Sequence, residues 1–132
     1  MILATIVVVN YNGLEHLPPL FASLAAQTCR DFEIVFVDNG SSDGSAAAAL
    51  QLGAAYGIKT NLICNDDNRG FAPACNQGID VSQAEYVIML NNDTRPEAQW
   101  IERLIATVLL KPYLVMIIHL LMRSSSFPLN VF

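Results

Sequence analysis

The sequence predicts a three-layer α/β/α fold that is built on a mostly parallel sheet. Two observations predict this class. Apolar, β-branched runs of the kind found in strands buried on both faces alternate along the chain with segments of helical period. Several of these runs end in polar, turn-forming residues, which would meet at the carboxyl edge of a parallel sheet. With 132 residues, 53% of them hydrophobic, the chain suffices for one domain with a buried core.

The first predicted strand covers residues 3–9 and ends in the turn sequence Asn10-Tyr11-Asn12-Gly13. A helix is predicted over residues 14–27. Its apolar residues recur at helical spacing, and Pro18 and Pro19 are compatible only with its first turn. The chain therefore begins with a strand, a polar loop and a helix.

The same unit then repeats. We expect strands at residues 32–37, 60–64 and 86–90, and helices at residues 45–56, at residues 71–81 and from Pro96 to about Leu110. Pro96 suits the first position of a helix, because an N–H at that position would have no partner within the helix. Strands that alternate with helices imply right-handed crossovers, so the loops after the first, second and fourth strands should gather at one rim.

The pattern changes beyond Lys111-Pro112. Residues 113–122 are apolar almost throughout, and residues 123–132 show no period. We therefore expect one domain over residues 1–122, followed by an irregular tail. A membrane anchor over residues 104–122 is a weaker alternative, because Lys111-Pro112 interrupts the apolar run.

Charge and cysteine content narrow the class of partner. The net charge is −5 and the seven Lys and Arg residues are scattered, so we expect no nucleic-acid partner. An acidic protein that binds a phosphorylated ligand needs a cation between the two negative groups. Cys29, Cys64 and Cys75 form no CxxC pair, so we expect reduced, buried thiols.

We expect a cytoplasmic location for the protein, or a peripheral location at the inner face of the membrane.

Asp93 is the best candidate for a metal ligand. It directly follows a predicted buried strand in the segment YVIMLNNDTRP, between the neutral oxygen donors Asn92 and Thr94. A hard cation such as Mg²⁺ or Mn²⁺ can bind through one such carboxylate together with substrate phosphates and water. The alternative is that these residues form a turn and cap the next helix.

Asp38 ends the second predicted strand, before a loop rich in Ser and Gly. Its carboxylate could accept hydrogen bonds from a nucleobase or ribose, or it could form an Asx-turn. The loop, DNGSSDG, lacks the GK[ST] ending of a P-loop and does not match the GxGxxG fingerprint. The sequence therefore does not support a P-loop nucleotide-binding enzyme or a dinucleotide-binding enzyme of the GxGxxG type.

Arg69 lies at a predicted junction between a loop and a helix, where its guanidinium could grip a diphosphate. The alternative is a surface arginine that pairs with Asp66 or Asp67. Gly70 would allow close backbone approach or a positive φ, and we expect Asn76 to have a structural role.

The chain combines four such segments in one order: TIVVVNYNG, FEIVFVDNGSSDGS, NRGFAPACNQGI and YVIMLNNDTRP. In this order and at these separations, they resemble family 2 glycosyltransferases with the GT-A fold, the Rossmann-like fold of nucleotide-diphospho-sugar transferases. The resemblance covers roughly residues 5–122 and looks closest to a subgroup that transfers rhamnose and related sugars. It implies roles for the candidate residues: Asn10, Tyr11 and Asp38 at the nucleotide base, Asn92 at the ribose, Arg69 at the diphosphate, and Asp93, in a DXD-like motif, at the divalent metal.

The reaction that the resemblance implies is inverting, metal-assisted transfer of a hexose in polysaccharide biosynthesis. The donor would be a UDP- or dTDP-sugar, and the acceptor a saccharide or lipid-linked hydroxyl. Members of the family usually continue well past this length and carry the base aspartate in their later part. We therefore expect a truncated domain with an unknown catalytic base, impaired transfer, and self-association through an exposed sheet edge. The alternative is a non-catalytic nucleotide-binding or assembly module.

Overall fold

The computed structural model describes residues 2–110 of the chain. Within this range four strands pair in parallel in the order β3-β2-β1-β4. The strands are β1 (Ala4–Asn10), β2 (Phe32–Asp38), β3 (Thr60–Cys64) and β4 (Tyr86–Asn91). The helices are the short 3-10 turn η1 (Leu14–His16), α1 (Leu17–Ala25), α2 (Ser45–Tyr56), α3 (Phe71–Val81) and α4 (Trp100–Leu110).

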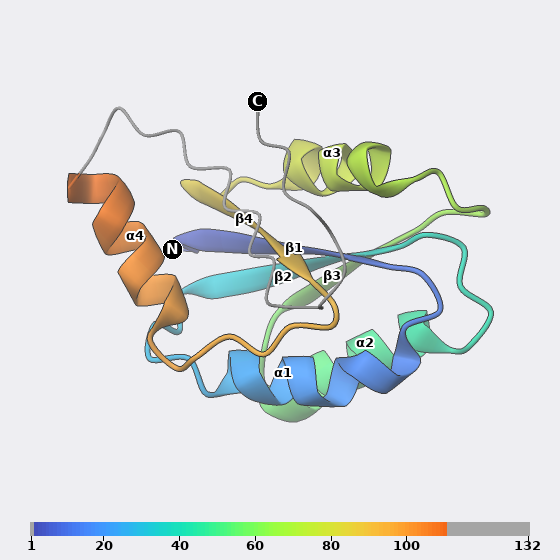
Figure 1. The fold of residues 1–132 in the computed structure, drawn as a ribbon, viewed down its shortest axis with the longest axis horizontal. Coiled ribbons are helices and arrows are strands. Elements are labelled where there is room, and N and C mark those ends of the chain that lie inside the picture. Colours follow the sequence, from blue (N-terminus) through green and yellow to red (C-terminus); the bar gives the residue numbers. More distant parts are fainter. Residues whose placement is uncertain (1, 111–132) are drawn as a thin grey trace, which may run out of the picture.

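The sheet forms the middle of three layers (Figure 1). Helices α1 and α2 cover one face, and α3 covers the other. Trp100, Ile101 and Ile105 of α4 join the same apolar cluster as the buried residues of α1. The predicted three-layer fold with a parallel sheet is therefore confirmed.

The alternation of side chains along the strands separates two cores of unequal size. Ile6, Ile34 and Phe36 face α1 and belong to the larger cluster, in which all three are fully buried. Val7 and Val35 face α3 and belong to a cluster with few members. The apolar cluster between α3 and the sheet thus has far fewer buried members than the cluster on the opposite face, to which α1, α2 and α4 all contribute.

Helix α3 lies close to the sheet. A Cβ atom on Gly78 would collide with the side chain of Val7 in β1. Ala74, also fully buried, faces the sheet on the same side of the helix. Two small residues at this spacing therefore let the helix backbone approach the central strand.

The beginning of α4 differs from the prediction. The helix begins at Trp100 rather than at Pro96. The side chain of Gln27 donates from Nε2 to the Glu97 carbonyl at 2.8 Å and accepts at Oε1 from the Ile101 N–H at 3.1 Å. The Thr28 N–H also donates to the Ala98 carbonyl. These contacts hold the segment before Trp100 in a non-helical conformation. They come from Gln27 and Thr28, which are distant in sequence, so the helix propensity of residues 96–99 does not predict them.

The cysteine prediction is partly wrong. Cys75 is buried and burial raises the pKa of its thiol, but Cys29 is half-buried and Cys64 is exposed. Cys64 is the last residue of β3, a strand with β2 as its one partner in the described sheet, which leaves its side chain open to solvent.

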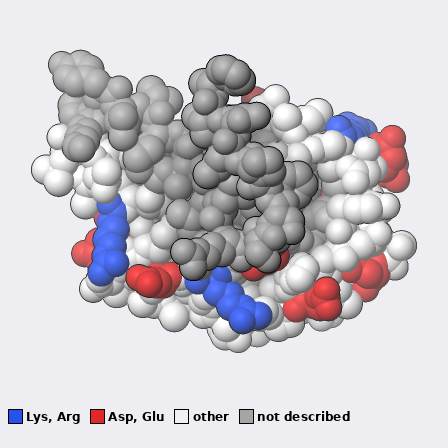
Figure 2. Space-filling model, viewed as in Figure 1, with Lys and Arg blue, Asp and Glu red and all other residues white. Residues whose placement is uncertain are grey.

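The predictions for residues 113–122, for the domain boundary at residue 122 and for the tail lie outside the described residues. Within residues 2–110, none of the helices has the length and apolarity needed to cross a bilayer. On the face drawn in Figure 2, the basic side chains are well separated and lie among acidic ones. The described part of that face shows no basic stripe.

Candidate functional site

The carboxyl ends of β1, β2 and β4 bring three of the predicted residues into direct contact. Asn10, only 1% exposed, donates from Nδ2 to Oδ1 of Asp38 at 3.1 Å. Its own Oδ1 accepts from Nδ2 of Asn92 at 2.7 Å. Parallel pairing fixes this arrangement, because the register places Asn10 beside Asp38 at the ends of their strands. Asn10 thus connects Asp38, which was predicted to contact the nucleotide base, with Asn92, which was predicted to contact the ribose.

Asp38 is fixed by hydrogen bonds within the protein. Besides the bond from Asn10, its Oδ2 accepts from the Ser41 N–H at 3.0 Å, and the residue is 3% exposed. This is the turn-forming arrangement that was the alternative to ligand binding. Each carboxylate oxygen retains further acceptor capacity, so a role at the nucleotide base stays a prediction.

Asp43 has the structural contacts expected of a loop residue. Its Oδ2 accepts from the Leu14 N–H at 2.9 Å, and its Oδ1 accepts from the backbone N–H and the hydroxyl of Ser45. The hydrogen bond from the Ser45 hydroxyl, aided by the two backbone N–H groups, lowers the pKa of the Asp43 carboxyl. The loop that follows β2 is therefore tied to the start of η1.

A cavity of about 330 Å³ opens at this edge of the sheet. Its lining combines aromatic rings, amide side chains and one carboxylate: Val9, Tyr11, Asn39, Asn68, Phe71, Asn91, Asn92 and Asp93. Tyr11 is 52% exposed, which leaves its ring available for stacking on a planar ligand. Of the predicted residues, Tyr11, Asn92 and Asp93 line this cavity directly.

Asp93 presents an exposed carboxylate to the cavity and forms no hydrogen bond or ion pair with any residue in the range 2–110. The expected turn is present, because the Thr94 hydroxyl donates to the Asn91 carbonyl at 2.7 Å. The expected cap is absent, since α4 begins only at Trp100.

The donor set around Asp93 fits a hard divalent cation. Residues 2–110 contain no group of three His, Cys, Asp or Glu side chains that would form a complete metal site. Asp93 would therefore share the cation with amide oxygens, water and ligand phosphates, which is how Mg²⁺ is commonly held.

Arg69 does not line the cavity. Its Nε lies 3.5 Å from Oδ1 of Asp67, and both side chains are well exposed. The predicted alternative, a surface pair with a neighbouring aspartate, is what the structure shows. Asn76 is exposed, and it is Gln77 that ties α3 to the preceding loop, through Asn65.

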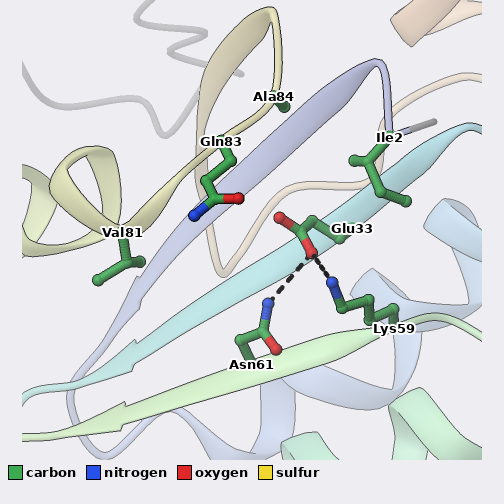
Figure 3. Close-up of a pocket in the computed structure, with 7 residues that line it drawn as sticks. All are labelled: Ile2, Glu33, Lys59, Asn61, Val81, Gln83 and Ala84. Atoms are coloured by element: carbon green, nitrogen blue, oxygen red, sulfur yellow. Dashed lines mark hydrogen bonds and ion pairs between the residues drawn. The ribbon is translucent and has the colours of Figure 1, made fainter.

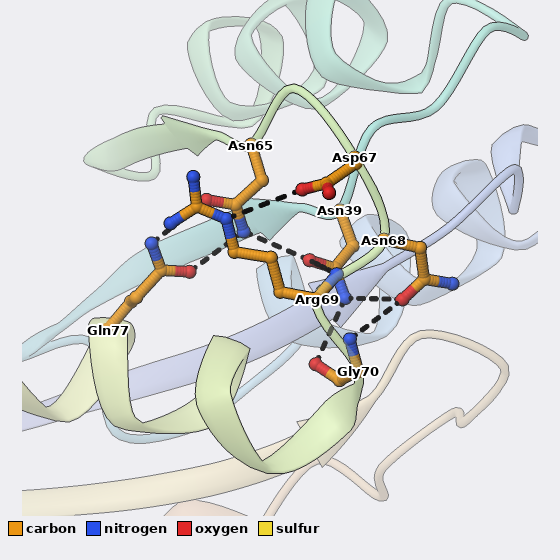
Figure 4. A network of polar contacts seen from close by, with 7 residues as sticks. All are labelled: Asn39, Asn65, Asp67, Asn68, Arg69, Gly70 and Gln77. Carbon is orange, nitrogen blue, oxygen red and sulfur yellow. Dashed lines mark hydrogen bonds and ion pairs between the residues drawn. The ribbon is translucent and has the colours of Figure 1, made fainter.

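Sequence reasoning missed five residues of the cavity wall: Val9, Asn39, Asn68, Phe71 and Asn91. Two of them, Asn39 and Asn68, are in direct contact (Figure 4). Asn39 is 2% exposed and donates from Nδ2 to Oδ1 of Asn68 at 3.0 Å. A signal was present, because each of the four strands ends in or is followed by asparagine. Read together, these asparagines indicate one polar edge that all four strands build.

A second cavity, of about 430 Å³, lies at the opposite, amino end of the sheet (Figure 3). There Glu33, 6% exposed, accepts from Nζ of Lys59 at 2.7 Å, from Nδ2 of Asn61 at 3.1 Å and from the hydroxyl of Thr5 at 3.3 Å. Both oxygens of its carboxylate thus accept hydrogen bonds from neighbouring side chains. We read this cluster as structural.

Comparison with known proteins identifies the family. The model of glycosyl transferase family 2 matches residues 5–128. Glycosyltransferase AglE of Haloferax volcanii is 30% identical over 106 residues, which are 79% of this chain and 34% of that protein. A PGL/p-HBAD biosynthesis glycosyltransferase of Mycobacterium tuberculosis is 31% identical over 105 residues, 79% of this chain and 41% of that protein. The chain thus spans between about a third and two fifths of the length of these relatives.

Solved structures agree on the fold. The mannosyltransferase PcManGT of Pyrobaculum calidifontis, in complex with GDP-Man and Mn²⁺, has a TM-score of 0.64 and 25% identity over 68% of this chain and 27% of that one. TarS of S. aureus, in complex with UDP, has a TM-score of 0.72 at 20% identity over 80% of this chain and 32% of that one. Together with the family match, these likenesses lead to one conclusion: the chain belongs to glycosyl transferase family 2.

Proposed function

We propose that the described domain binds a nucleotide diphosphate sugar, with a divalent cation, as the donor part of an inverting glycosyltransferase. The observation on which this rests is the Asp93 carboxylate, which is exposed at the cavity without a partner in residues 2–110. A carboxylate held at the end of a buried strand and facing amide donors suits a metal that is completed by a diphosphate. The complex of PcManGT with GDP-Man and Mn²⁺ supports the same combination of ligands.

In this proposal each residue of the site has one role. Tyr11 stacks on the nucleotide base, and Asn10 with Asp38 forms the polar floor beside it. Asn92, held through its Nδ2 by Asn10, turns its amide oxygen toward the ribose hydroxyls. Asp93 holds the cation, which when bound neutralises charge on the departing diphosphate.

In this proposal the Arg69 side chain leaves Asp67 when the donor binds and turns toward the diphosphate. The pair is solvent-exposed on both sides and its atoms are 3.5 Å apart, so it costs little to break. A guanidinium that reaches the diphosphate stabilises the charge that develops as the sugar departs, and this lowers the barrier more than it strengthens ground-state binding.

The non-catalytic alternative also has a specific observation in its favour. Among the residues that line the cavity, Asp93 is the one carboxylate, and it is assigned to the metal. The described residues therefore place no second carboxylate there to deprotonate an acceptor hydroxyl. In this alternative the domain would bind the donor and transfer nothing.

Calorimetric titration tests the proposal. UDP and dTDP are titrated with and without Mn²⁺ into wild type, into Asp93→Asn and into the control Asp80→Asn, which removes an exposed carboxylate from α3 outside the cavity. We expect Mn²⁺ to strengthen binding by about tenfold or more in wild type and in the control, and to have no effect in Asp93→Asn. Binding that is equal with and without Mn²⁺ in wild type would contradict the metal role.

A second assay separates transfer from binding. The chain is incubated with UDP- and dTDP-sugars and Mn²⁺, and release of the nucleotide is compared with transfer to saccharide acceptors. Donor binding with neither hydrolysis nor transfer would favour the non-catalytic alternative. Transfer would show that a base outside the described cavity lining serves the acceptor.

A further inference from the structure

We infer that Asn39 is a positioning residue: it holds the loop of residues 65–70 so that the Asn68 amide presents its N–H groups to the diphosphate of the donor. This inference rests on the proposed function, because it concerns the same cavity. It assigns a role in donor binding to a second wall of the cavity. The loops after β2 and β3 form this wall, which is separate from the wall that contains Asp93.

The side chain of Asn39 uses its whole hydrogen-bonding capacity on that loop (Figure 4). Its Nδ2 donates to Oδ1 of Asn68 at 3.0 Å and to the Gly70 carbonyl at 3.1 Å. Its Oδ1 accepts from Nδ2 of Asn65 at 2.9 Å and from the Arg69 N–H at 3.3 Å. An asparagine amide offers two donated and two accepted bonds, and here all four go to one segment.

The loop is fastened at two further points. Asn65 and Gln77 exchange reciprocal amide hydrogen bonds at 2.8 and 2.9 Å, which tie the loop to α3. Gly40, at φ +82, lies so close to Asp67 that a Cβ atom would come within 2.9 Å of its backbone. The two loops are therefore in direct contact and form one wall of the cavity.

The contact with Asn39 determines which way the Asn68 amide faces. Its Oδ1 accepts both from Nδ2 of Asn39 and from the Gly70 N–H, at 3.0 Å in each case. The oxygen is thus occupied toward the loop, and the NH₂ group of this cavity-lining residue is left for the ligand. An N–H donor suits an anionic phosphate oxygen, whereas an amide oxygen at the same place would repel it.

The isosteric variant Asn39→Asp tests this arrangement, because it keeps both acceptors and removes both donors. Asn68 would then turn its NH₂ group toward the new carboxylate and its oxygen toward the ligand. We expect affinity for UDP with Mn²⁺ to fall by about tenfold and affinity for uridine to change little. Asn68→Ala, at an exposed position, should have the same selective effect.

The double variant separates positioning from simple charge repulsion. If Asn39 acts through Asn68, adding Asn39→Asp to Asn68→Ala causes no further loss of UDP affinity. Asn61→Asp is the matched control: it puts a carboxylate beside Glu33 at the other end of the sheet (Figure 3), so it should lower stability and leave UDP affinity unchanged. Additive losses in the double variant, or equal losses for UDP and uridine, would overturn the inference.

Amide hydrogen exchange tests the loop without any ligand. The Gly70 N–H, which donates to Asn68, should exchange faster in Asn39→Asp and in Asn68→Ala than in wild type. Unchanged exchange in Asn39→Asp would overturn the positioning role even if UDP binds. If wild type binds no nucleotide, the proposed function and the ligand part of the inference both fail, and exchange alone decides whether Asn39 orders the loop.

Discussion

Asparagine side chains connect the ends of all four strands at the cavity. Asn10, Asn39, Asn65 and Asn92 each form hydrogen bonds that cross from one strand end or loop to another. An amide can donate and accept at once, so it links neighbours without adding charge. A row of carboxylates in these positions would instead repel a diphosphate ligand. Among the residues that line the cavity, Asp93 is then the one carboxylate that can attract a cation.

Gly40 is required both by its backbone conformation and by the space around it. Its φ is +82, and a Cβ atom would approach the backbone of Asp67 to 2.9 Å. We predict that Gly40→Ala lowers the free energy of unfolding by about 2–3 kcal/mol, since it adds a steric clash to the strain of a left-handed residue. Urea denaturation measures this change.

Gly44→Ala is the control for strain alone. Gly44 has a similar φ of +87, but apart from its two neighbours in the chain no described residue has an atom within 4 Å of where its Cβ would be. We expect a loss of only about 1 kcal/mol. Equal losses in the two variants would mean that the contact between the loops after β2 and β3 contributes nothing.

At the scale of elements, α4 depends on a side chain distant in sequence. Gln27, 3% exposed, bonds both the Glu97 carbonyl and the Ile101 N–H and so marks where the helix begins. An N–H in the first turn of a helix has no partner within the helix, and here it receives one from the loop after α1. The helix is therefore docked at its first turn as well as through Trp100 and Ile105.

We predict that Gln27→Met, which is close in size but cannot form these bonds, destabilises the protein by about 2–4 kcal/mol, because buried backbone groups lose their partners. Thermal unfolding followed by circular dichroism measures the loss. The matched control is Gln99→Met, the same exchange at an exposed position just before α4, which should stay within about 0.5 kcal/mol of wild type. A smaller effect at Gln27 than at Gln99 would contradict this account.

At the scale of the whole molecule, the described sheet ends in β3 on one side and β4 on the other. Val87 of β4 is 38% exposed and Leu110 at the end of α4 is 82% exposed. An edge strand with apolar side chains is a template for pairing with another chain. Self-association, which was expected from the sequence, stays a prediction. We expect the contact to form along the edge strand β4.

We predict that wild type forms concentration-dependent dimers or larger species in light scattering, and that Val87→Lys shifts it toward monomer. A charged side chain on an edge strand opposes strand pairing. Leu50→Lys on α2 is the control, since Leu50 has a similar exposure of 42% and α2 packs near β2 and β3, away from the β4 edge. A wild type that is monomeric at every concentration would refute the prediction.

The sequence predicted the fold well because the information was local. Strand β2 and helix α2 follow from continuous apolar runs and turn residues, and the order of motifs indicated the family. The start of α4 was wrong because Gln27, some seventy residues earlier, determines it. Asn39 was missed for the same reason, since its partners lie in a loop that approaches only after folding.

The central position of β1 has a consequence for synthesis. By the time Cys64 has emerged from the ribosome, the chain already contains the three adjacent strands β1, β2 and β3 with α1 and α2, which can begin to fold as a unit. Strand β4 pairs with β1 later, and the bond from Asn92 to Asn10 joins residues 82 positions apart. Among the described residues, the side of the cavity that contains Asp93 is therefore the last to be synthesised.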